Sequence, residues 1–181
     1  SLPDYGILPY AFAGLVLTAV MQSSSATIAI VLTSLNAEVI GFNAAAAMVV
    51  GANVGTTVTV ILGTIGGTQI KKRVALSHLM FNALTAVIGL LLLPLITWLI
   101  VIVLGPVGEN AVMGVALFHT IFNVLGLLIF LPFITLLSKG LIKAYPDKTR
   151  KTTKFIQNVT PEVSEAAVEG LRNEVLHLIT N

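Results

Sequence analysis

The chain has 181 residues, of which 56% are hydrophobic and only 10% are charged, and its mean hydropathy is +0.96. Soluble domains carry about 25% charged residues, so this composition indicates a membrane protein. The absence of cysteine excludes disulfides, thiolate chemistry and cysteine-based metal sites. The basic residues, within a net charge of +2, cluster beside apolar segments, which is typical of topology signals and not of a nucleic-acid surface.

The first apolar segment, at 6–35, is interrupted by Gln22-Ser23-Ser24-Ser25. Because serine caps helices well, we expect one helix to end near Gln22 and a second to begin at the serines. The segment divides into two half-length arms, which favours a re-entrant hairpin over a single span. The start of the second arm would then place amide donors and hydroxyls inside the membrane, suited to an anion or to Na⁺. The alternative is a close helix–helix contact made by small residues.

The second apolar segment, at 42–65, contains Gly51-Ala52-Asn53-Val54-Gly55-Thr56-Thr57. Glycine allows a helix to unwind, so we predict a discontinuous transmembrane helix whose broken middle faces the serine tract. The alternative reading is packing, because two glycines four residues apart are the common motif for close approach of transmembrane helices.

The third and fourth apolar segments, at 74–104 and 111–137, complete the membrane part, and Pro94 predicts a kink in the third. Basic residues flank this pair at 71–73 and after Ser138, whereas the connection at 105–110 has no lysine or arginine. The positive-inside rule therefore predicts that both basic clusters and the C-terminus are cytoplasmic and that the 105–110 turn is external.

Both of these segments contain the pattern His-x-x-Phe-Asn early in their length, at 78–82 and 119–123, and they run in opposite directions through the membrane under this topology. The match indicates a local pseudo-symmetry. For His78 and His119 we favour a structural role over proton relay. Asn82 and Asn123 are expected to bond across helices.

The tail differs in kind from the membrane part. Thr160-Pro161-Glu162 predicts a helix start, and apolar residues then recur at helical spacing to 178. We therefore expect a membrane repeat at 1–140, a basic cytoplasmic linker at 141–159 and the start of a cytoplasmic helical domain at 160–181. The opening Ser1-Leu2-Pro3-Asp4 carries no signal-peptide pattern, and we expect the chain to be an internal piece of a longer protein.

The serine tract at 22–27, the glycine–asparagine tract at 51–57 and the two His-x-x-Phe-Asn motifs together resemble the type II sodium–phosphate cotransporter family. The resemblance covers about residues 8–140, and the tail from about Thr160 is similar to the opening of a PhoU-like helical domain. It implies an all-α polytopic membrane protein that is one half of an inverted-repeat transporter, with a second Gln-Ser-Ser-Ser tract supplied by another repeat or by a second copy in a homodimer.

The resemblance also implies function. The expected activity is symport, the Na⁺-coupled uptake of inorganic phosphate across the inner (plasma) membrane by a multi-pass protein in the lipid bilayer. No cofactor, no enzyme activity and no nucleic-acid partner are expected, and Na⁺ is the coupling ion. The residues expected to bind phosphate and Na⁺ are Gln22, Ser23, Ser24, Ser25, Thr27, Asn53, Gly55, Thr56 and Thr57. Within this set, the expected Na⁺ ligands are Ser24, Ser25, Asn53 and Thr56.

Two alternatives to phosphate uptake remain open on the sequence. One is a carrier of another oxyanion. The other is a membrane anchor that positions a cytoplasmic phosphate-sensing helical module.

Overall fold

A computed structural model describes residues 5–106, 110–147 and 164–180. The chain divides into two compact units, 1–147 and 148–181, and each is described by itself. The described residues are helical throughout their regular structure, in agreement with the predicted all-α class.

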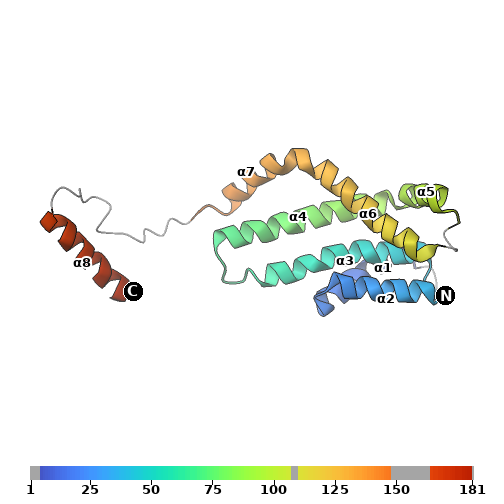
Figure 1. The fold of residues 1–181 in the computed structure, drawn as a ribbon, viewed down its shortest axis with the longest axis horizontal. Helices are drawn as coiled ribbons and strands as arrows, with labels where there is room; N and C mark the ends of the chain where they lie inside the picture. Colours follow the sequence, from blue (N-terminus) through green and yellow to red (C-terminus); the bar gives the residue numbers. More distant parts are fainter. Residues whose placement is uncertain (1–4, 107–109, 148–163, 181) are drawn as a thin grey trace. The chain divides into compact units, whose positions relative to one another are not determined.

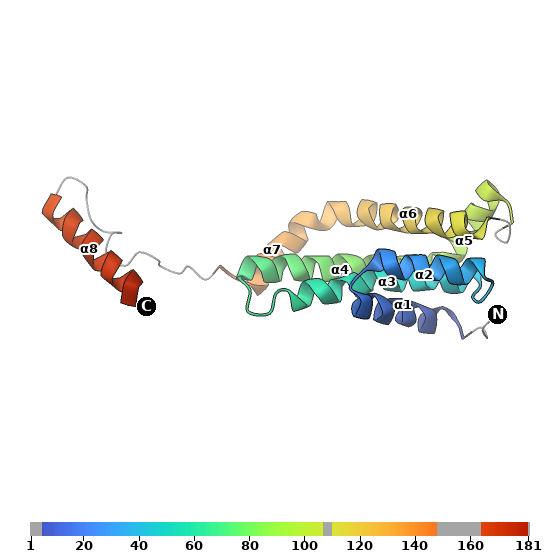
Figure 2. The ribbon, with the colours of Figure 1, turned by 60° about the horizontal axis from the view of Figure 1, so that its bottom comes forward.

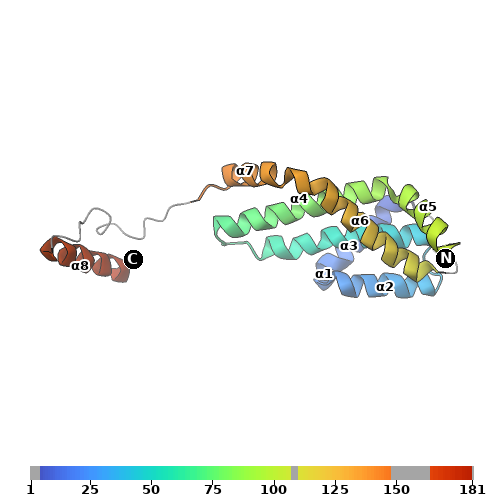
Figure 3. The same cartoon turned by 45° about the horizontal axis from the view of Figure 1, so that its top comes forward.

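The first two helices, α1 (Ile7–Met21) and α2 (Ser24–Asn36), form an antiparallel hairpin beside α3 (Phe42–Leu62). At 1.5 Å per residue they are about 22 and about 20 Å long, less than the roughly 30 Å of a bilayer core. Figures 1 to 3 show their connection lying short of the turn that joins α3 to the next helix. The predicted hairpin shape, with a helix ending near Gln22 and another starting at the serines, is therefore present.

The predicted break in the second segment is wrong, because α3 runs as one helix from Phe42 to Leu62. Its glycines serve close packing. A methyl group at Gly51 would collide with the Ala11 carbonyl of α1, and one at Gly55 would lie 2.6 Å from the Leu15 carbonyl oxygen. The glycines thus allow the backbones of α1 and α3 to approach closely, and the i−4 hydrogen bonds of α3 continue through the tract without a break.

Two bent segments complete the membrane unit. The first consists of α4 (Gln69–Leu91) and α5 (Leu93–Leu104), and the second of α6 (Ala111–Phe130), the 3₁₀ turn η1 (Leu131–Phe133) and α7 (Ile134–Ala144). Pro94 stands in the first turn of α5, which confirms the predicted kink. The second bend, which contains Pro132 in η1, was not predicted.

The core contains small and branched side chains of α3 and aromatic rings of α6. Ala45, Ala46, Ala47, Val49 and Val50 are fully buried together with Phe118 and Phe122. Many large apolar side chains point outward instead, including Phe12, Val20, Leu91 and Leu128. Within the described residues, three helical segments are long and apolar enough to cross a membrane, at 42–62, 69–91 and 111–144. An apolar exterior of this kind suits a lipid environment.

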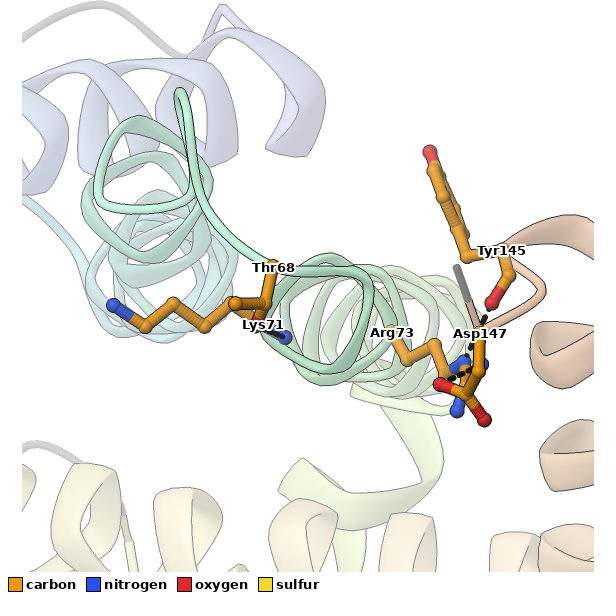
Figure 4. A network of polar contacts seen from close by, with 5 residues as sticks. All are labelled: Thr68, Lys71, Arg73, Tyr145 and Asp147. Atoms are coloured by element: carbon orange, nitrogen blue, oxygen red, sulfur yellow. Dashed lines mark hydrogen bonds and ion pairs between the residues drawn. The ribbon is translucent and has the colours of Figure 1, made fainter. Parts of the chain in front are cut away.

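Lys71, Lys72 and Arg73 at the start of α4 lie at the same end of the membrane unit as Lys143 at the end of α7. Arg73, near the start of α4, donates one hydrogen bond to the Tyr145 carbonyl oxygen and another to Asp147 Oδ1, both at 2.8 Å (Figure 4). These bonds join the start of α4 to the end of α7. The opposite end holds the start of α6 and the end of α2, which share the lining of one cavity at residues 35–38 and 110–113.

In the second unit, α8 (Ser164–Thr180) exposes Val168, Leu171, Val175 and Leu178. Leu171, Val175 and Leu178 belong to the stripe that helical spacing predicted, whereas Val168 does not. Glu174, a charged residue of the same helix, is buried. The predicted helix start at Thr160-Pro161-Glu162 lies outside the described residues.

Candidate functional site

The turn between α1 and α2 is built on Gln22. This residue adopts a left-handed conformation, with φ of 54° and ψ of 25°, and its backbone N–H donates to the Thr18 carbonyl at 2.7 Å. Residues with a Cβ adopt this region at a cost of about 1 kcal/mol, and glycine fills it without strain. The Gln22 side chain is exposed. Gln22 is thus a turn residue whose exposed side chain is accessible to a ligand.

The serines start α2. Ser23 is its N-cap, and its hydroxyl accepts a hydrogen bond from the Ala26 N–H at 3.3 Å. The N–H groups of Ser24 and Ser25 stand in the first turn, where a helix offers no internal acceptor. Two amide donors and two hydroxyls therefore gather at the positive end of the α2 dipole. This arrangement suits an anion.

A continuous chain of contacts brings the serine tract level with the glycine tract of α3. The Thr18 hydroxyl of α1 donates a hydrogen bond to the Thr27 hydroxyl of α2 at 2.9 Å. The Thr27 hydroxyl in turn donates to the Ser23 carbonyl oxygen at 3.2 Å. Thr18 also packs on α3, because a methyl group at Gly55 would lie 2.7 Å from Thr18 Cβ. The first turn of α2 and the middle of α3 therefore lie at one level of the bundle.

The threonines of the α3 tract point their hydroxyl protons back at the helix. Thr56 donates to the Asn53 carbonyl and Thr57 to the Val54 carbonyl, both at 2.7 Å. Their oxygen lone pairs remain available to a cation. Thr57 is buried and Thr56 is half-buried.

Asn53 carries the most unusual polar group of the tract. Its amide nitrogen Nδ2 is buried and has no hydrogen-bond partner. A buried donor without an acceptor costs about 1–3 kcal/mol, which makes this amide a candidate ligand group. Helical periodicity places Asn53 about 200° from Gly51 and from Gly55, on the side of α3 turned away from α1. The predicted residues of α3 thus occupy different faces and do not form one wall.

The two later motifs behave alike. Asn82 Nδ2 donates to the His78 carbonyl at 3.1 Å, and Asn123 Nδ2 donates to the His119 carbonyl at 2.8 Å. The prediction that these amides bond across helices is therefore wrong for these donors, because each satisfies the carbonyl one turn earlier in its own helix. Among the described residues, no group of histidine and acidic side chains could hold a metal ion.

Sequence reasoning missed Thr18. This residue joins the hairpin arms and contacts α3, yet it stands alone in an apolar stretch. Its spacing of four residues before Gln22 was the available signal, because that spacing places the two residues on one face of a helix. The sequence also gave no weight to Gly14, where a methyl group would collide with the Met48 carbonyl of α3.

Comparison with known proteins gives the chain a family. The family described as Na⁺/Pi-cotransporter matches residues 9–125. The uncharacterized protein YqeW of Bacillus subtilis (strain 168) is 33% identical over 123 residues, which are 68% of this chain and 39% of that relative. This chain therefore spans about two fifths of the relative's length, and no solved structure matches it. By its match over residues 9–125, the chain belongs to the Na⁺/Pi-cotransporter family.

Proposed function

We propose that this chain takes part in sodium-coupled symport of inorganic phosphate, with the substrate bound where the start of α2 meets the middle of α3. The observation that carries the proposal is the start of α2, where the N–H groups of Ser24 and Ser25 lie level with the middle of α3. The buried Asn53 amide, on another face of α3, adds a donor without a partner among the described residues. Family membership supports phosphate and Na⁺ as the transported pair.

Phosphate needs hydrogen-bond donors, and the proposed site supplies several. We assign this role to the Gln22 and Asn53 amides, the backbone N–H groups at the start of α2 and the hydroxyls of Ser24 and Ser25. The hydroxyl of Ser23 caps α2, and Thr27, Gly55 and Thr57 hold the surrounding helices in place. We assign Na⁺ to oxygen atoms of Ser24, Ser25, Asn53 and Thr56, because hard cations take neutral oxygen ligands.

Charge balance explains coupling under this proposal. In the segment 5–70, the only charged side chain is Glu38, which lies beyond the end of α2 and far along the chain from the serines. Helix dipoles and hydroxyls offset only part of the charge of phosphate, so a co-bound cation must supply the rest. Phosphate binding then depends on Na⁺ without a separate gate.

Uptake of radiolabelled phosphate into proteoliposomes tests this mechanism. We expect uptake driven by an inward Na⁺ gradient and loss of uptake when choline replaces Na⁺. Equal phosphate binding in the sodium and choline salts would contradict the mechanism. Competition by arsenate and sulfate in the same assay identifies the anion, and stronger inhibition by sulfate than by arsenate would favour a carrier of a different oxyanion.

We further propose that the start of α2 lies inside the bilayer and that the basic end of the unit is cytoplasmic. Support comes from Arg73, which joins the basic start of α4 to the end of α7 beside Lys143, and from the shortness of α1 and α2. The hairpin would then enter and leave from the outer side. We also propose that the region 160–181, which includes α8, is the start of a cytoplasmic helical module that follows a linker at 141–159.

A further inference from the structure

The two bent segments match each other helix by helix at a constant spacing of 41 positions, as from His78 to His119. At this spacing, Leu93 at the start of α5 corresponds to Ile134 at the start of α7. The starts of α4 and α6 agree within one residue. Identical residues occur at ten equivalent pairs, 74/115, 75/116, 76/117, 78/119, 81/122, 82/123, 84/125, 88/129, 90/131 and 95/136. The similarity therefore extends well beyond the short motif.

The contacts between α4 and α6 obey the same relation. Phe81 stacks edge-on against Phe130, with ring centroids 5.1 Å apart. The equivalents of these two residues are Phe122 and Gly89, and they also meet, because a methyl group at Gly89 would lie 3.3 Å from the Phe122 ring. A two-fold axis requires such paired contacts, whereas two merely antiparallel helices do not.

A pair of equivalent residues that touch each other marks the position of the axis. Thr85 and Gly126 are equivalent, and they are in contact, since a methyl group at Gly126 would lie 3.0 Å from Thr85 Cβ. Figures 1 to 3 show the short helices α5 and α7 at opposite ends of the α4/α6 pair, as the two-fold relation demands. Each copy also starts beside a cavity at its own end, of about 520 Å³ next to Lys72 and about 480 Å³ next to its equivalent Met113.

The repeated amides flank this axis symmetrically. Asn82 and Asn123 precede the axial residues by three positions, which places them about 4.5 Å to either side along the helices. Asn82 lies toward the basic end and Asn123 toward the opposite end. Each amide nitrogen donates to the backbone carbonyl four residues earlier, so the two side chains have the same orientation in their own copies. The side-chain oxygen Oδ1 of each asparagine keeps its capacity to accept hydrogen bonds.

We infer that α4–α5 and α6–α7 are two inverted copies of one helix–bend–helix unit with a two-fold axis through the Thr85–Gly126 contact, and that Asn82 and Asn123 are equivalent positioning residues that serve the transport site from opposite sides of the membrane. The structural half of this inference stands on contacts alone. The half that concerns Asn82 and Asn123 rests on the proposed transport function.

An exchange of the axial residues tests the symmetry. In the purified full-length protein, Gly126→Thr alone should lower the melting temperature by collision, and Thr85→Gly alone should lower it by leaving a cavity and a flexible helix. The double variant places the threonine on the other side of the axis, so it should recover more than half of the larger loss. Recovery of less than half would overturn the symmetry. As an off-axis control, the exchange Gly89→Phe with Phe122→Gly should not recover.

Transport from the two sides tests the equivalence of the asparagines. Asn82→Ala should raise the half-saturating phosphate concentration about fivefold for flux that starts at the basic end, with little change from the other side. Asn123→Ala should raise the half-saturating phosphate concentration for flux that starts at the opposite end, with little change from the basic end. Vesicles of each orientation allow the two directions to be measured separately. Equal effects on both sides, or effects on maximal rate alone, would overturn the assignment. The melting experiment needs no substrate, so a failure of phosphate transport itself would leave the symmetry result intact.

Discussion

Thr18 on α1 donates a hydrogen bond of 2.9 Å to Thr27 on α2, and both side chains are fully buried. The bond lies one turn from the hairpin connection on each arm. It fixes the two arms where the serine tract begins, and Thr18 also contacts Gly55 of α3. One buried hydroxyl pair thus determines how the start of α2 is held against α3.

Replacing this pair should expose the coupling between the arms. We expect Thr18→Val and Thr27→Val each to destabilise the protein by about 1–2 kcal/mol, because each leaves a buried hydroxyl or carbonyl without its partner. The double variant should cost about 1 kcal/mol less than the two single losses together. Unfolding of the four proteins in a detergent–denaturant series measures the cycle, and full additivity would show that the bond adds nothing.

Gln22 offers a test that separates stability from transport. Gln22→Gly relieves the left-handed backbone, so stability should stay constant or rise by up to about 1 kcal/mol, while phosphate uptake falls at least tenfold. Gln22→Ala is the matched control, because it removes the same amide but keeps the strain. Both variants should lose uptake although their melting temperatures move apart. Normal uptake by the glycine variant would reduce Gln22 to a turn residue.

The unpartnered Asn53 amide predicts a gain in stability at the expense of function. Asn53→Leu removes a buried unsatisfied donor and keeps the volume, so we expect about 1 kcal/mol of added stability together with loss of Na⁺-dependent uptake. Thr97 provides the matched control, because its hydroxyl is also buried without a partner, on α5. Thr97→Val should stabilise the protein and leave uptake unchanged. A stable Asn53→Leu variant with normal uptake would contradict the proposed site.

The glycines of α3 should differ sharply in their tolerance of a side chain. Gly55→Ala brings a methyl group within 2.6 Å of the Leu15 carbonyl oxygen, where backbone cannot yield easily, and should cost about 3 kcal/mol. Gly63→Ala, at the end of the same helix, meets its nearest neighbours at 3.5 Å and should be tolerated. Thermal unfolding of both variants decides. Similar melting temperatures would contradict the close packing of α1 on α3.

Arg73 should matter more than the acid that it pairs with. Asp147 is 66% exposed, so Asp147→Asn should change stability by less than about 0.5 kcal/mol. Arg73→Met removes the bond to the Tyr145 carbonyl as well and should cost about 1–2 kcal/mol.

Cross-linking of cysteines introduced at 73 and 145 is specific, because the chain has no native cysteine. Its yield at rest and during uptake reports whether this contact stays closed.

Several features were determined by the sequence alone. Apolar segments and their polar interruptions predicted an all-helical membrane unit, the end of α1 near Gln22 and the kink at Pro94, because local hydrogen bonding and proline sterics decide these features within a few residues. The resemblance carried by the serine and glycine tracts predicted the family, which the comparison confirmed. The half-length arms predicted a hairpin for the same local reason.

Only the tertiary structure decided what the α3 tract does. Glycine permits both unwinding and close packing, and the sequence cannot distinguish them, because the outcome depends on whether another backbone approaches. Here Ala11 and Leu15 of α1 do approach, so α3 remains continuous and its asparagine turns away from its glycines. The same holds for the 41-residue relation. Its motif is visible in the sequence, but the axis at Thr85 and Gly126 exists only through contacts between helices that are distant along the chain.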